Sequence, residues 1–548
     1  MEIFDIILLI VGAVSCVLLW LLAGFSEKVV NTKWRLCYII PAFLCILLVY
    51  IGGTELCMIP AYLAMAGLSV GAARDEVRVR HLSSVICGVL ILITVPICLL
   101  DNGYRNRHDY LGDFKKGFDS MKEHYALTEY KQIDFDALWD KYYPQFREVQ
   151  NNNDAVENVI VWKCFTSEFR DGHVGYSTDD EITDKAVEKA SGNDYGLVIV
   201  TLSDGRTVAA ETDSSLESIG IHNGTEILTW EGMTPAEADK KSRYYEMNCG
   251  LYSDAGSAEF FEGIYAAGVG GDTAEVRYID DAGNEQTAVL KKLKGCYHDR
   301  FEKAEEKLMR GYDAAHMSFT RIDDTTACLR IKIMSYDKKS SATENHAGMV
   351  SKLREDVTAL MADGVKDIII DIRSNGGGSA DMVKGIASVF APAGEHYYVT
   401  DALWDEDSNC YVRDENGGYI KGTDNYFNGE NILGDGRVIL LVDAYAASAA
   451  DHLTKVMQGM ENVTIMGFTK AAGVGQGVYG IDLENGSLQY SSSVLLNKDG
   501  SIFIDAGTDH ITGDDIDIKV PLDEEAFRAL FDEDRDYLLE KALEQLKD

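Results

Sequence analysis

One segment of this chain, residues 438–457, constrains its fold more than any other. The apolar run Val438–Val442 predicts a buried strand, and after a short turn a helical pattern begins directly behind Ser448. About 60 residues earlier, a second apolar run that starts at Asp367 ends in three consecutive glycines, Gly376–Gly378. Strands that end in loops and lead into helices predict an α/β core with its site at the carboxyl ends of the strands.

The residue types at these two strand ends indicate nucleophilic chemistry. Ser448 stands at the start of a predicted helix, and the glycines at 376–378 leave their backbone N–H groups uncovered by side chains. A hydroxyl beside such amides is the arrangement of a nucleophile next to an oxyanion hole. The sequence therefore predicts a serine hydrolase, in which a further group must activate Ser448.

The α/β pattern extends over the whole C-terminal part of the chain, from Ala327 to Val520. Predicted strands and predicted helices alternate there, which favours an open sheet covered by helices. The strands are predicted at 327–333, 367–373, 437–442 and 464–467, and the helices at 342–363, 380–390 and 449–460.

Two regions with other sequence patterns precede this core. Amphipathic patterns predict helices at 113–124, 135–149 and 154–169, and the last of them stops at a glycine. His173 follows that glycine on a turn, from which its side chain can reach into a cleft. Residues 191–295 then change to short alternating strands separated by glycine-containing turns, which is typical of a small β domain.

The first hundred residues predict a membrane region. Four apolar runs, at about 6–23, 37–51, 58–70 and 84–100, have lengths suited to crossing a bilayer as helices. A cleaved signal peptide fits the first run poorly, because no basic residue precedes it and three more runs follow. Basic residues gather in the loops 28–35 and 74–80, so the positive-inside rule places residues after 100 outside the cytoplasm. We therefore expect a multi-pass protein of the cell membrane whose catalytic domain is extracytoplasmic.

Charge and cysteine usage limit the possible partners. The first 100 residues are neutral, so the net charge of −38 comes from the remainder, which holds 45 basic and 83 acidic residues. Such a polyanionic body argues against nucleic acid as a ligand. The 11 cysteines include no Cys-x-x-Cys pair, and neither their spacing nor that of the histidines supports a metal site. We therefore expect no cofactor and no metal.

Four segments together resemble the family of C-terminal processing peptidases and tricorn-type serine peptidases, over roughly residues 110–525. They are the helical stretch 133–144, the Phe-Arg-Asp-Gly-His run at 169–173, the Asp-Ile-Arg-Ser-Asn-Gly-Gly-Gly run at 371–378 and the Ala-Ser-Ala-Ala-Asp run at 447–451. The resemblance implies an α/β serine peptidase core of the ClpP/crotonase type with a helical cap and an inserted PDZ-like β domain.

This resemblance sets the expected domain boundaries. We expect a transmembrane region of about four helices at 1–102, a helical cap at 103–190, a PDZ-like domain at 191–295 and the peptidase core at 296–548. Residues 219–221 and 224–228 are similar to a helix end and a following strand of PDZ domains in bacterial proteases. PDZ domains take a peptide C-terminus as an added strand, so the expected partner is a peptide or protein substrate with a free C-terminus.

The family that the chain resembles activates its serine in two ways. One branch uses a lysine in a loop about 25 residues after the serine, where this chain has Gly473 in the lysine position and Lys470 three residues earlier. The other branch uses a histidine at the end of the cap and a carboxylate near the C-terminus, which correspond here to His173 and Asp505.

The chemistry of the two candidate bases favours the second branch. An ordinary imidazole is poised near neutral pH, whereas a lysine becomes a base there only after strong desolvation. We therefore predict Ser448 as the nucleophile, His173 as the general base and Asp505 as its orienting carboxylate, with the N–H groups of Gly377 and Ala449 as the oxyanion hole. Two alternatives remain open: a Ser448–Lys470 dyad, and a catalytically inactive PDZ-type module that binds peptides without cutting them.

Overall fold

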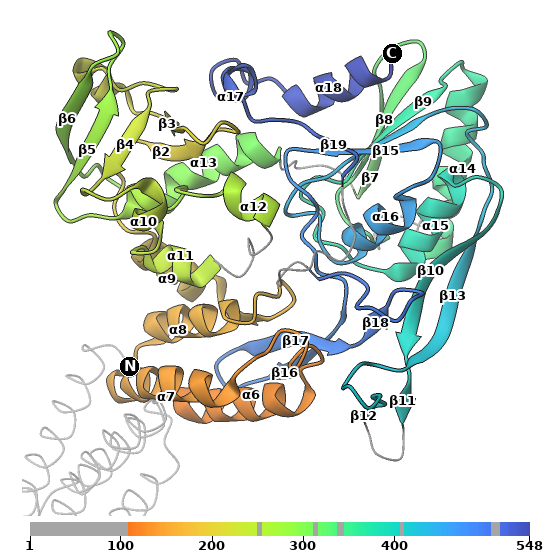
Figure 1. Ribbon diagram of the computed structural model, residues 1–548, viewed down its shortest axis with the longest axis horizontal. Coiled ribbons are helices and arrows are strands. Elements are labelled where there is room, and N and C mark those ends of the chain that lie inside the picture. The colour runs from red at the N-terminus through yellow and green to blue at the C-terminus, as the bar shows by residue number, and fades with distance from the viewer. Residues whose placement is uncertain are drawn as a thin grey trace, which may run out of the picture. The chain divides into compact units, whose positions relative to one another are not determined.

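The structure is a computed structural model that describes residues 108–248, 255–310, 316–336, 345–405, 410–505 and 516–547. The chain divides into two compact units, Met1–Asp109 and Tyr110–Asp548. The elements below all belong to the second unit, and most of them are labelled in Figure 1.

A helical cap opens this unit with α6 (Tyr110–His124), α7 (Phe135–Asn152) and α8 (Ala155–Ser167). Asp134 and Asp154 stand directly before α7 and α8, and each side chain accepts a hydrogen bond from a backbone N–H of the first helical turn. Aromatic rings on all three helices are fully buried against one another, with Phe114 and Phe146 stacked at 4.2 Å between centroids. The packed rings hold the end of α8, and they belong to a buried cluster that continues beyond the cap.

Small sheets and short helices follow the cap. After α9 (Asp180–Ser191), strands β2 (Val198–Thr201) and β3 (Thr207–Ala210) form one antiparallel pair. A second antiparallel sheet contains β4 (Ile227–Trp230), β5 (Thr273–Ile279) and β6 (Glu285–Lys291). Between and after them lie η2 (Ser214–Ile219), α10 (Pro235–Asp239), α11 (Arg243–Asn248), α12 (Ala255–Phe260), η3 (Ala266–Gly268) and α13 (Tyr297–Met309).

The C-terminal part is built on a six-stranded sheet in the order β19-β15-β14-β9-β8-β7, visible on the right of Figure 1. Only β7 is antiparallel to its neighbour; the other neighbouring strands pair in parallel. The strands are β7 (Met317–Arg321), β8 (Thr326–Ile331), β9 (Asp367–Asp371), β14 (Val438–Leu441), β15 (Val463–Gly467) and β19 (Ile518–Lys519).

Helices cover both faces of this sheet. Ile368 and Ile370 belong to one buried cluster with side chains of α14 (His346–Ala362), α15 (Ala380–Phe390) and α16 (Ala449–Met457). Ile369 points to the other face and belongs to the cluster that contains α17 (Glu524–Phe531) and α18 (Tyr537–Gln545). Successive residues of β9 are therefore buried on opposite faces, as expected for a strand in the middle of a covered parallel sheet.

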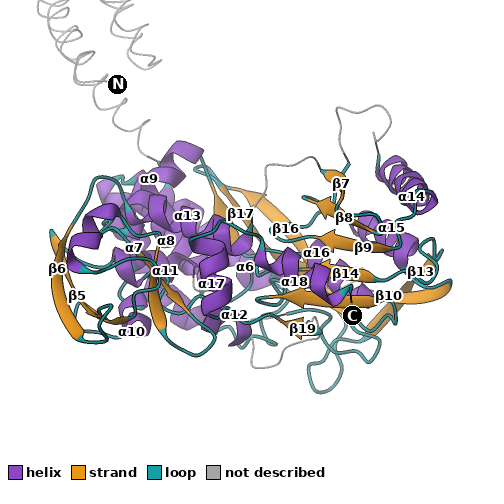
Figure 2. Ribbon diagram, turned by 90° about the horizontal axis from the view of Figure 1, so that it is seen from above, coloured by secondary structure: helices purple, strands orange, loops and turns teal. Residues whose placement is uncertain are grey.

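Further strands extend the core and join it to the cap, as Figure 2 shows from above. Strand β1 (Gly175–Ser177) leaves the cap and pairs with β17 (Ser487–Ser493), which also pairs with β16 (Gly477–Asp482). The remaining strands are β10 (Gly394–Ala402), β11 (Trp404–Asp405), β12 (Cys410–Tyr411), β13 (Lys421–Gly429) and β18 (Leu495–Leu496). Pairing of β1 with β17 positions the turn that carries His173 against the core.

One part of the predicted fold class is wrong. The sequence predicted a multi-span membrane region with the bilayer as a partner and a multi-pass localisation, and the four apolar runs lie outside the described residues. Across the described ranges, no helix is both long enough and apolar enough to cross a bilayer. The longest of these helices, α7, has 18 residues and carries charged side chains, and its apolar side packs against the other two cap helices, α6 and α8. This finding overturns the membrane prediction and leaves the α/β part of the predicted fold class.

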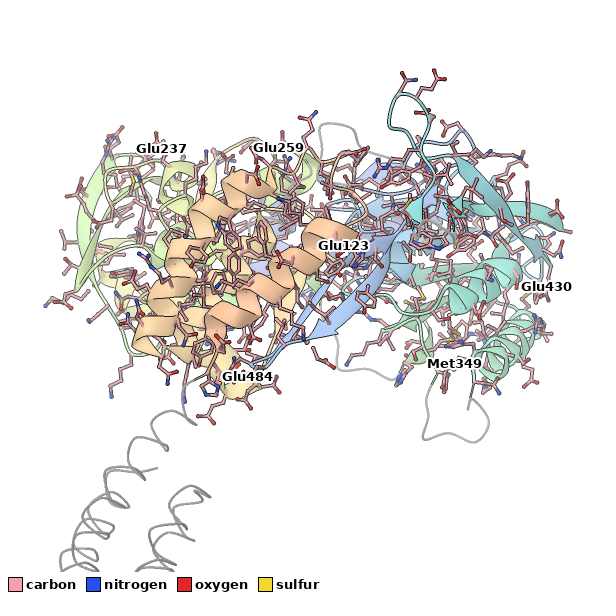
Figure 3. All side chains as sticks on the ribbon, turned by 90° about the horizontal axis from the view of Figure 1, so that it is seen from below. Glu123, Glu237, Glu259, Met349, Glu430 and Glu484 are labelled. Atoms are coloured by element: carbon pink, nitrogen blue, oxygen red, sulfur yellow. The ribbon has the colours of Figure 1, made fainter. Side chains whose placement is uncertain are left out.

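Acidic side chains are distributed over the surface. The glutamates labelled in Figure 3 are all exposed, and they belong to α6, α10, α12 and the loops after β13 and β16. They are Glu123, Glu237, Glu259, Glu430 and Glu484. The negative charge is therefore not concentrated on a single element.

Candidate active site

Ser448 occupies the turn between β14 and α16. Its backbone has φ 59° and ψ −115°, a conformation that residues other than glycine rarely adopt. The surrounding turn imposes this conformation, because Ala447 N–H donates to the Asn375 carbonyl and His452 N–H donates to the Ser448 carbonyl, both at 2.9 Å. The Ser448 side chain is half-buried, and it forms no capping bond to α16. The hydroxyl is thus presented at a helix start without being used to stabilise it.

The glycine turn after β9 lies against Ser448. A Cβ built on Gly377, whose φ is 93°, would be 2.7 Å from the Ser448 Cβ and 2.9 Å from the Ala449 N. Such a close approach is possible only for glycine. The structure therefore brings together the two residues predicted for the oxyanion hole, next to the predicted nucleophile.

The two predicted oxyanion donors differ in how their N–H groups are used. The N–H of Gly377 donates to the side-chain oxygen of Asn375 at 2.9 Å, and that fully buried amide also donates to the Ile331 carbonyl. Ala449 is the first residue of α16, and its N–H has no acceptor among the described residues. Ala449 is thus ready to donate to a ligand, whereas Gly377 would share its N–H between Asn375 and a ligand.

His173 lies on the turn between α8 and β1 and is 8% exposed. Its backbone N–H donates to Asp171 Oδ1 at 2.9 Å. Burial lowers the pKa of its imidazole, and the charge of Asp171 and a hydrogen bond to the Gln476 backbone oppose that effect. Within the described chain, Nδ1 of His173 is buried and has no hydrogen-bond partner. A buried imidazole with a lowered pKa is neutral at neutral pH, as a general base must be.

Asp505 is 4% exposed and contacts a buried cation that the sequence did not indicate. The Nζ of Lys131 lies 2.5 Å from Asp505 Oδ1, and the Lys131 side chain is 0% exposed. The same Nζ donates to the Arg170 carbonyl at 2.5 Å. Among the described residues, the His173 ring bonds the Gln476 backbone rather than Asp505. The predicted carboxylate is therefore in the site region but is held by Lys131.

Lys470, the alternative base, is half-buried in the loop after β15. No hydrogen bond joins the Ser448 hydroxyl to Lys470 or to His173 within the described residues. Gly473, which occupies the position of the lysine in the other branch, donates its N–H to Asp451 Oδ1 at 2.7 Å. This bond fixes the loop to the first turn of α16.

His452, one helical turn after Ser448, is a second buried histidine that the sequence analysis did not assign. Its Nε2 lies 2.8 Å from the Gly475 carbonyl and its Nδ1 lies 2.6 Å from the Tyr398 hydroxyl. A carbonyl only accepts, so Nε2 carries the proton and Nδ1 accepts from the tyrosine. Burial and, to a smaller extent, the nearby His173 lower the pKa of His452 to about 4, although the hydrogen bond to the Gly475 carbonyl opposes this effect. In the sequence, its spacing of four residues from Ser448 was the signal that could have placed His452 near the site.

One buried carboxylate holds together the loops that carry the site. Asp443, at the end of β14, accepts hydrogen bonds from the N–H groups of Ser374 and Tyr445 at 2.9 and 3.0 Å. Burial raises the pKa of Asp443 to about 6. Because Ser374 precedes the glycine turn and Tyr445 precedes Ser448, one carboxylate connects the two halves of the site.

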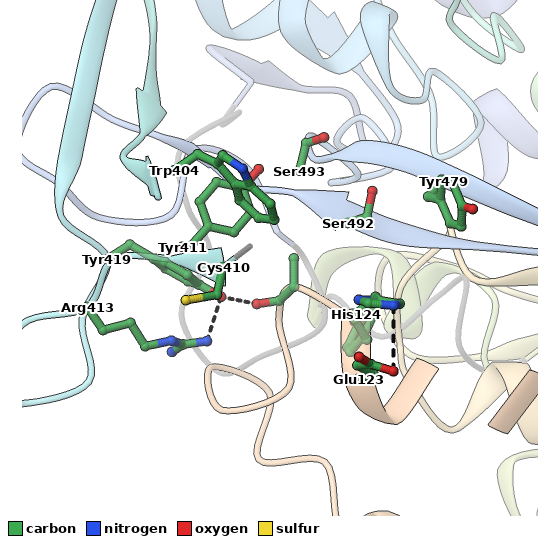
Figure 4. Close-up of a pocket in the computed structure, with 12 residues that line it drawn as sticks. Glu123, His124, Trp404, Cys410, Tyr411, Arg413, Tyr419, Tyr479, Ser492 and Ser493 are labelled. Carbon is green, nitrogen blue, oxygen red and sulfur yellow. Dashed lines mark hydrogen bonds and ion pairs between the residues drawn. The ribbon is translucent and has the colours of Figure 1, made fainter. Parts of the chain in front are cut away.

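One cavity has a volume of about 610 Å³, and Ser448 is not among the residues that line it. Figure 4 shows its aromatic lining from the β11–β12 hairpin and from β16, together with the end of α6. Tyr125 lines the cavity, and its hydroxyl donates to Asp171 Oδ2 at 3.0 Å. Two hydrogen bonds therefore connect this cavity to the backbone of His173. In the described part of the chain, no three His, Cys, Asp or Glu side chains gather to hold a metal ion.

Comparison with known proteins gives a family match for part of the chain and a similarity of fold. Residues 326–514 match the family described as Peptidase family S41. The fold is similar to that of mature CPAF, at 14% identity over 80% of this chain and 97% of that chain, with a TM-score of 0.51. A structure of mature CPAF complexed with lactacystin matches at 14% identity over 80% and 98% of the two chains, with a TM-score of 0.50.

A weaker similarity connects the chain with the photosystem II D1 C-terminal processing protease. It has 15% identity over 77% of this chain and 97% of that chain, with a TM-score of 0.34. The family match over the region that contains Ser448 defines this protein as a serine-type peptidase. The match is to peptidase family S41, so the predicted enzyme class is confirmed.

Proposed function

We propose that the protein hydrolyses peptide bonds through an acyl-enzyme on Ser448, with His173 as the general base and Asp505 as the carboxylate that orients it. The observation that carries the proposal is the arrangement around Ser448. Its hydroxyl is presented at a helix start in a conformation that the chain must impose, beside Gly377 and the N–H of Ala449. Backbone conformations of this kind concentrate at functional sites.

The proposed chemistry follows from these positions. His173 takes the proton from the Ser448 hydroxyl as the oxygen attacks the carbonyl carbon of the scissile bond. The carbonyl oxygen becomes negatively charged and accepts hydrogen bonds from the Ala449 N–H and from the Gly377 N–H. The intermediate then collapses, and His173 gives its proton to the departing amine. A water molecule deprotonated by His173 releases the acyl group in the second half of the reaction.

The resting geometry is compatible with this mechanism. The Ser448 hydroxyl and the His173 ring are not hydrogen-bonded to each other, and catalytic hydrogen bonds often tighten only when substrate is bound. Substrate would also exclude water from the cleft and strengthen each polar contact there. A Ser448–Lys470 dyad remains the alternative assignment. In the described structure, Lys470 likewise forms no hydrogen bond with the Ser448 hydroxyl.

The substrate is a peptide or protein, and we propose that its free C-terminus docks on residues 191–295 as an added strand. The support is the presence of two small antiparallel sheets with edge strands in that region. Strand β6 is an edge of one of them, and Val289 in its middle is 63% exposed. An exposed edge strand offers unpaired N–H and C=O groups to an extended peptide.

The test is covalent labelling of the purified full-length protein with a fluorophosphonate, which reacts with activated serines. We expect labelling of the wild type at one site, loss of labelling in Ser448→Ala, and unchanged labelling in Ser492→Ala, which removes a half-buried serine on β17. Peptide mapping should place the adduct on Ser448. A wild type that is folded and unlabelled would instead favour the inactive peptide-binding alternative.

A further inference from the structure

The buried lysine Lys131 connects the two residues that the proposed function assigns to activate Ser448. Its side chain is inaccessible to solvent, and its Nζ contacts Asp505 Oδ1 and the Arg170 carbonyl, each at 2.5 Å. Arg170 lies three residues before His173 in the same turn. One ammonium group therefore bonds both the segment that carries the carboxylate and the turn that carries the imidazole.

The turn before His173 needs such support, because its backbone is not regular. Arg170 has φ 46°, in the left-handed region that residues other than glycine seldom occupy. Asp171 fixes the following residues by accepting from the His173 N–H and from the Tyr125 hydroxyl. Lys131 fixes the preceding carbonyl. The position of the His173 ring is therefore determined by contacts on both sides of Asp171.

Asp505 is attached to the site through its neighbours as well. It pairs with Val474 in an isolated antiparallel bridge, and the N–H of Val474 donates to Asp451 Oδ2 at 3.2 Å. Two residues later, the Gln476 backbone bonds the His173 ring. Asp505 is thus within the same local network as His173, and the Lys131 ammonium is the charged group that joins them from the cap side.

A fully buried ammonium is costly unless a counter-charge and hydrogen-bond acceptors surround it. Lys131 has both, and a carboxylate can accept through each of its two oxygens. We propose that Lys131 is a positioning residue of the catalytic site: it holds the Asp505 carboxylate and the Arg170–His173 turn in one arrangement, so that the carboxylate can orient the imidazole. This inference rests on the proposed function of His173 and Asp505.

The test compares Lys131→Met, Asp505→Asn and the double variant in the full-length protein. The readouts are the limiting rate constant of fluorophosphonate labelling at saturating probe and the probe concentration that gives half of it. If Lys131 acts through Asp505, both single variants lose at least about tenfold in the limiting rate constant, and the double variant is no slower than the slower single variant. The half-saturating concentration should change by less than about twofold, because probe binding does not involve Lys131.

The matched control is Lys141→Met on α7, which removes a half-exposed lysine that pairs with Glu168 at 2.5 Å. We expect no change in labelling for it, because exposed ion pairs contribute little. If Lys131→Met labels at the wild-type rate and Asp505→Asn labels slowly, the inference is overturned but the proposed function is not. The inference is also overturned if the fold loss in rate constant of the double variant equals the product of the two single losses. A wild-type rate for Asp505→Asn would overturn the carboxylate assignment of the proposed function, and the inference with it.

Lys131→Met leaves Asp505 as a buried charge without its cation, so this variant can fail to fold. Circular dichroism and thermal unfolding of each variant would detect that outcome. Lys131→Arg then carries the test, because it keeps the charge but changes the donor geometry. We expect it to fold and to label about tenfold more slowly, since small misplacements of catalytic groups are costly. A folded Lys131→Arg variant that labels at the wild-type rate would overturn the inference.

Discussion

Gly377 packs so closely against Ser448 that a side chain at position 377 would not fit. A Cβ on Gly377 would lie 2.7 Å from the Ser448 Cβ and 2.6 Å from the Ala447 carbonyl oxygen, and Gly377 has φ 93°. We therefore predict that Gly377→Ala displaces the serine turn or the glycine turn and lowers the limiting labelling rate by roughly 10²-fold, as misplacement of catalytic groups commonly does. The measurement is fluorophosphonate labelling, with circular dichroism to verify folding.

The neighbouring glycine supplies the matched control. Gly376 is exposed, has no positive φ, and a Cβ on it would meet no atom within 4 Å. Gly376→Ala should therefore label within about twofold of the wild type, because an open surface position tolerates a methyl group. Equal losses in both variants would mean that the glycine turn acts through its flexibility rather than through close contact with Ser448.

Removal of the two candidate bases should have very different effects. His173→Ala is expected to lower hydrolysis by roughly 10³- to 10⁴-fold, in line with the loss of a triad member, whereas Lys470→Ala should cost less than about tenfold. Both variants should retain wild-type circular dichroism spectra. The measurement is hydrolysis of a fluorescent peptide library by the full-length protein. A reversed ranking would move the chain to the lysine branch of the family that it resembles.

The sequence predicted the core elements well, because their hydrophobic patterns are strong. The predicted helix 380–390 is α15 with identical ends, and the predicted strand 464–467 is β15 except for one residue. The predicted helix 449–460 ends earlier, at Met457, since Gln458 adopts an extended conformation. Patterns of this kind are local, so a single sequence suffices to detect them.

The environment of the site could not be predicted in the same way. Nothing in the segment around Lys131 distinguishes a buried cation from an exposed one, and its partner Asp505 is more than 370 residues away. His452 lies within the segment 438–457, but its contacts are with Tyr398 and Gly475, which belong to other elements. Long-range pairs of polar residues leave no periodic signal, so only the folded chain reveals them.

The pH dependence of labelling should reflect the burial of His173. Burial lowers the pKa of its imidazole from the ordinary value of 6.5, with the Asp171 charge and the Gln476 backbone bond opposing this. Because the neutral ring is the active form, activity should be lost as the pH falls through the lowered pKa, at a midpoint below 6.5. Asp171→Asn should move the midpoint further down, because it removes a charge that stabilises the imidazolium. A wild-type midpoint above 7 would contradict the assignment.

His452 should make the protein less stable in mild acid. Its pKa is lowered from 6.5 to about 4, so the unfolded chain binds more protons than the folded chain between these values. Stability is therefore lost as the pH falls through that window, by about 2 kcal/mol at pH 5. Buried Glu305, whose pKa is raised to about 7, acts in the opposite direction, so total stability alone does not isolate the histidine.

The test is the difference in unfolding free energy between the wild type and His452→Gln, measured by urea denaturation from pH 8 to pH 5. At pH 8 the variant should be less stable by about 1–3 kcal/mol, because the Tyr398 hydroxyl and the Gly475 carbonyl lose their partner. Glutamine does not titrate, so the difference should shrink by about 2 kcal/mol on going to pH 5. A difference that stays constant would mean that folding does not lower the pKa of His452, and a difference that grows would mean that folding raises it; either outcome would contradict a buried, neutral imidazole.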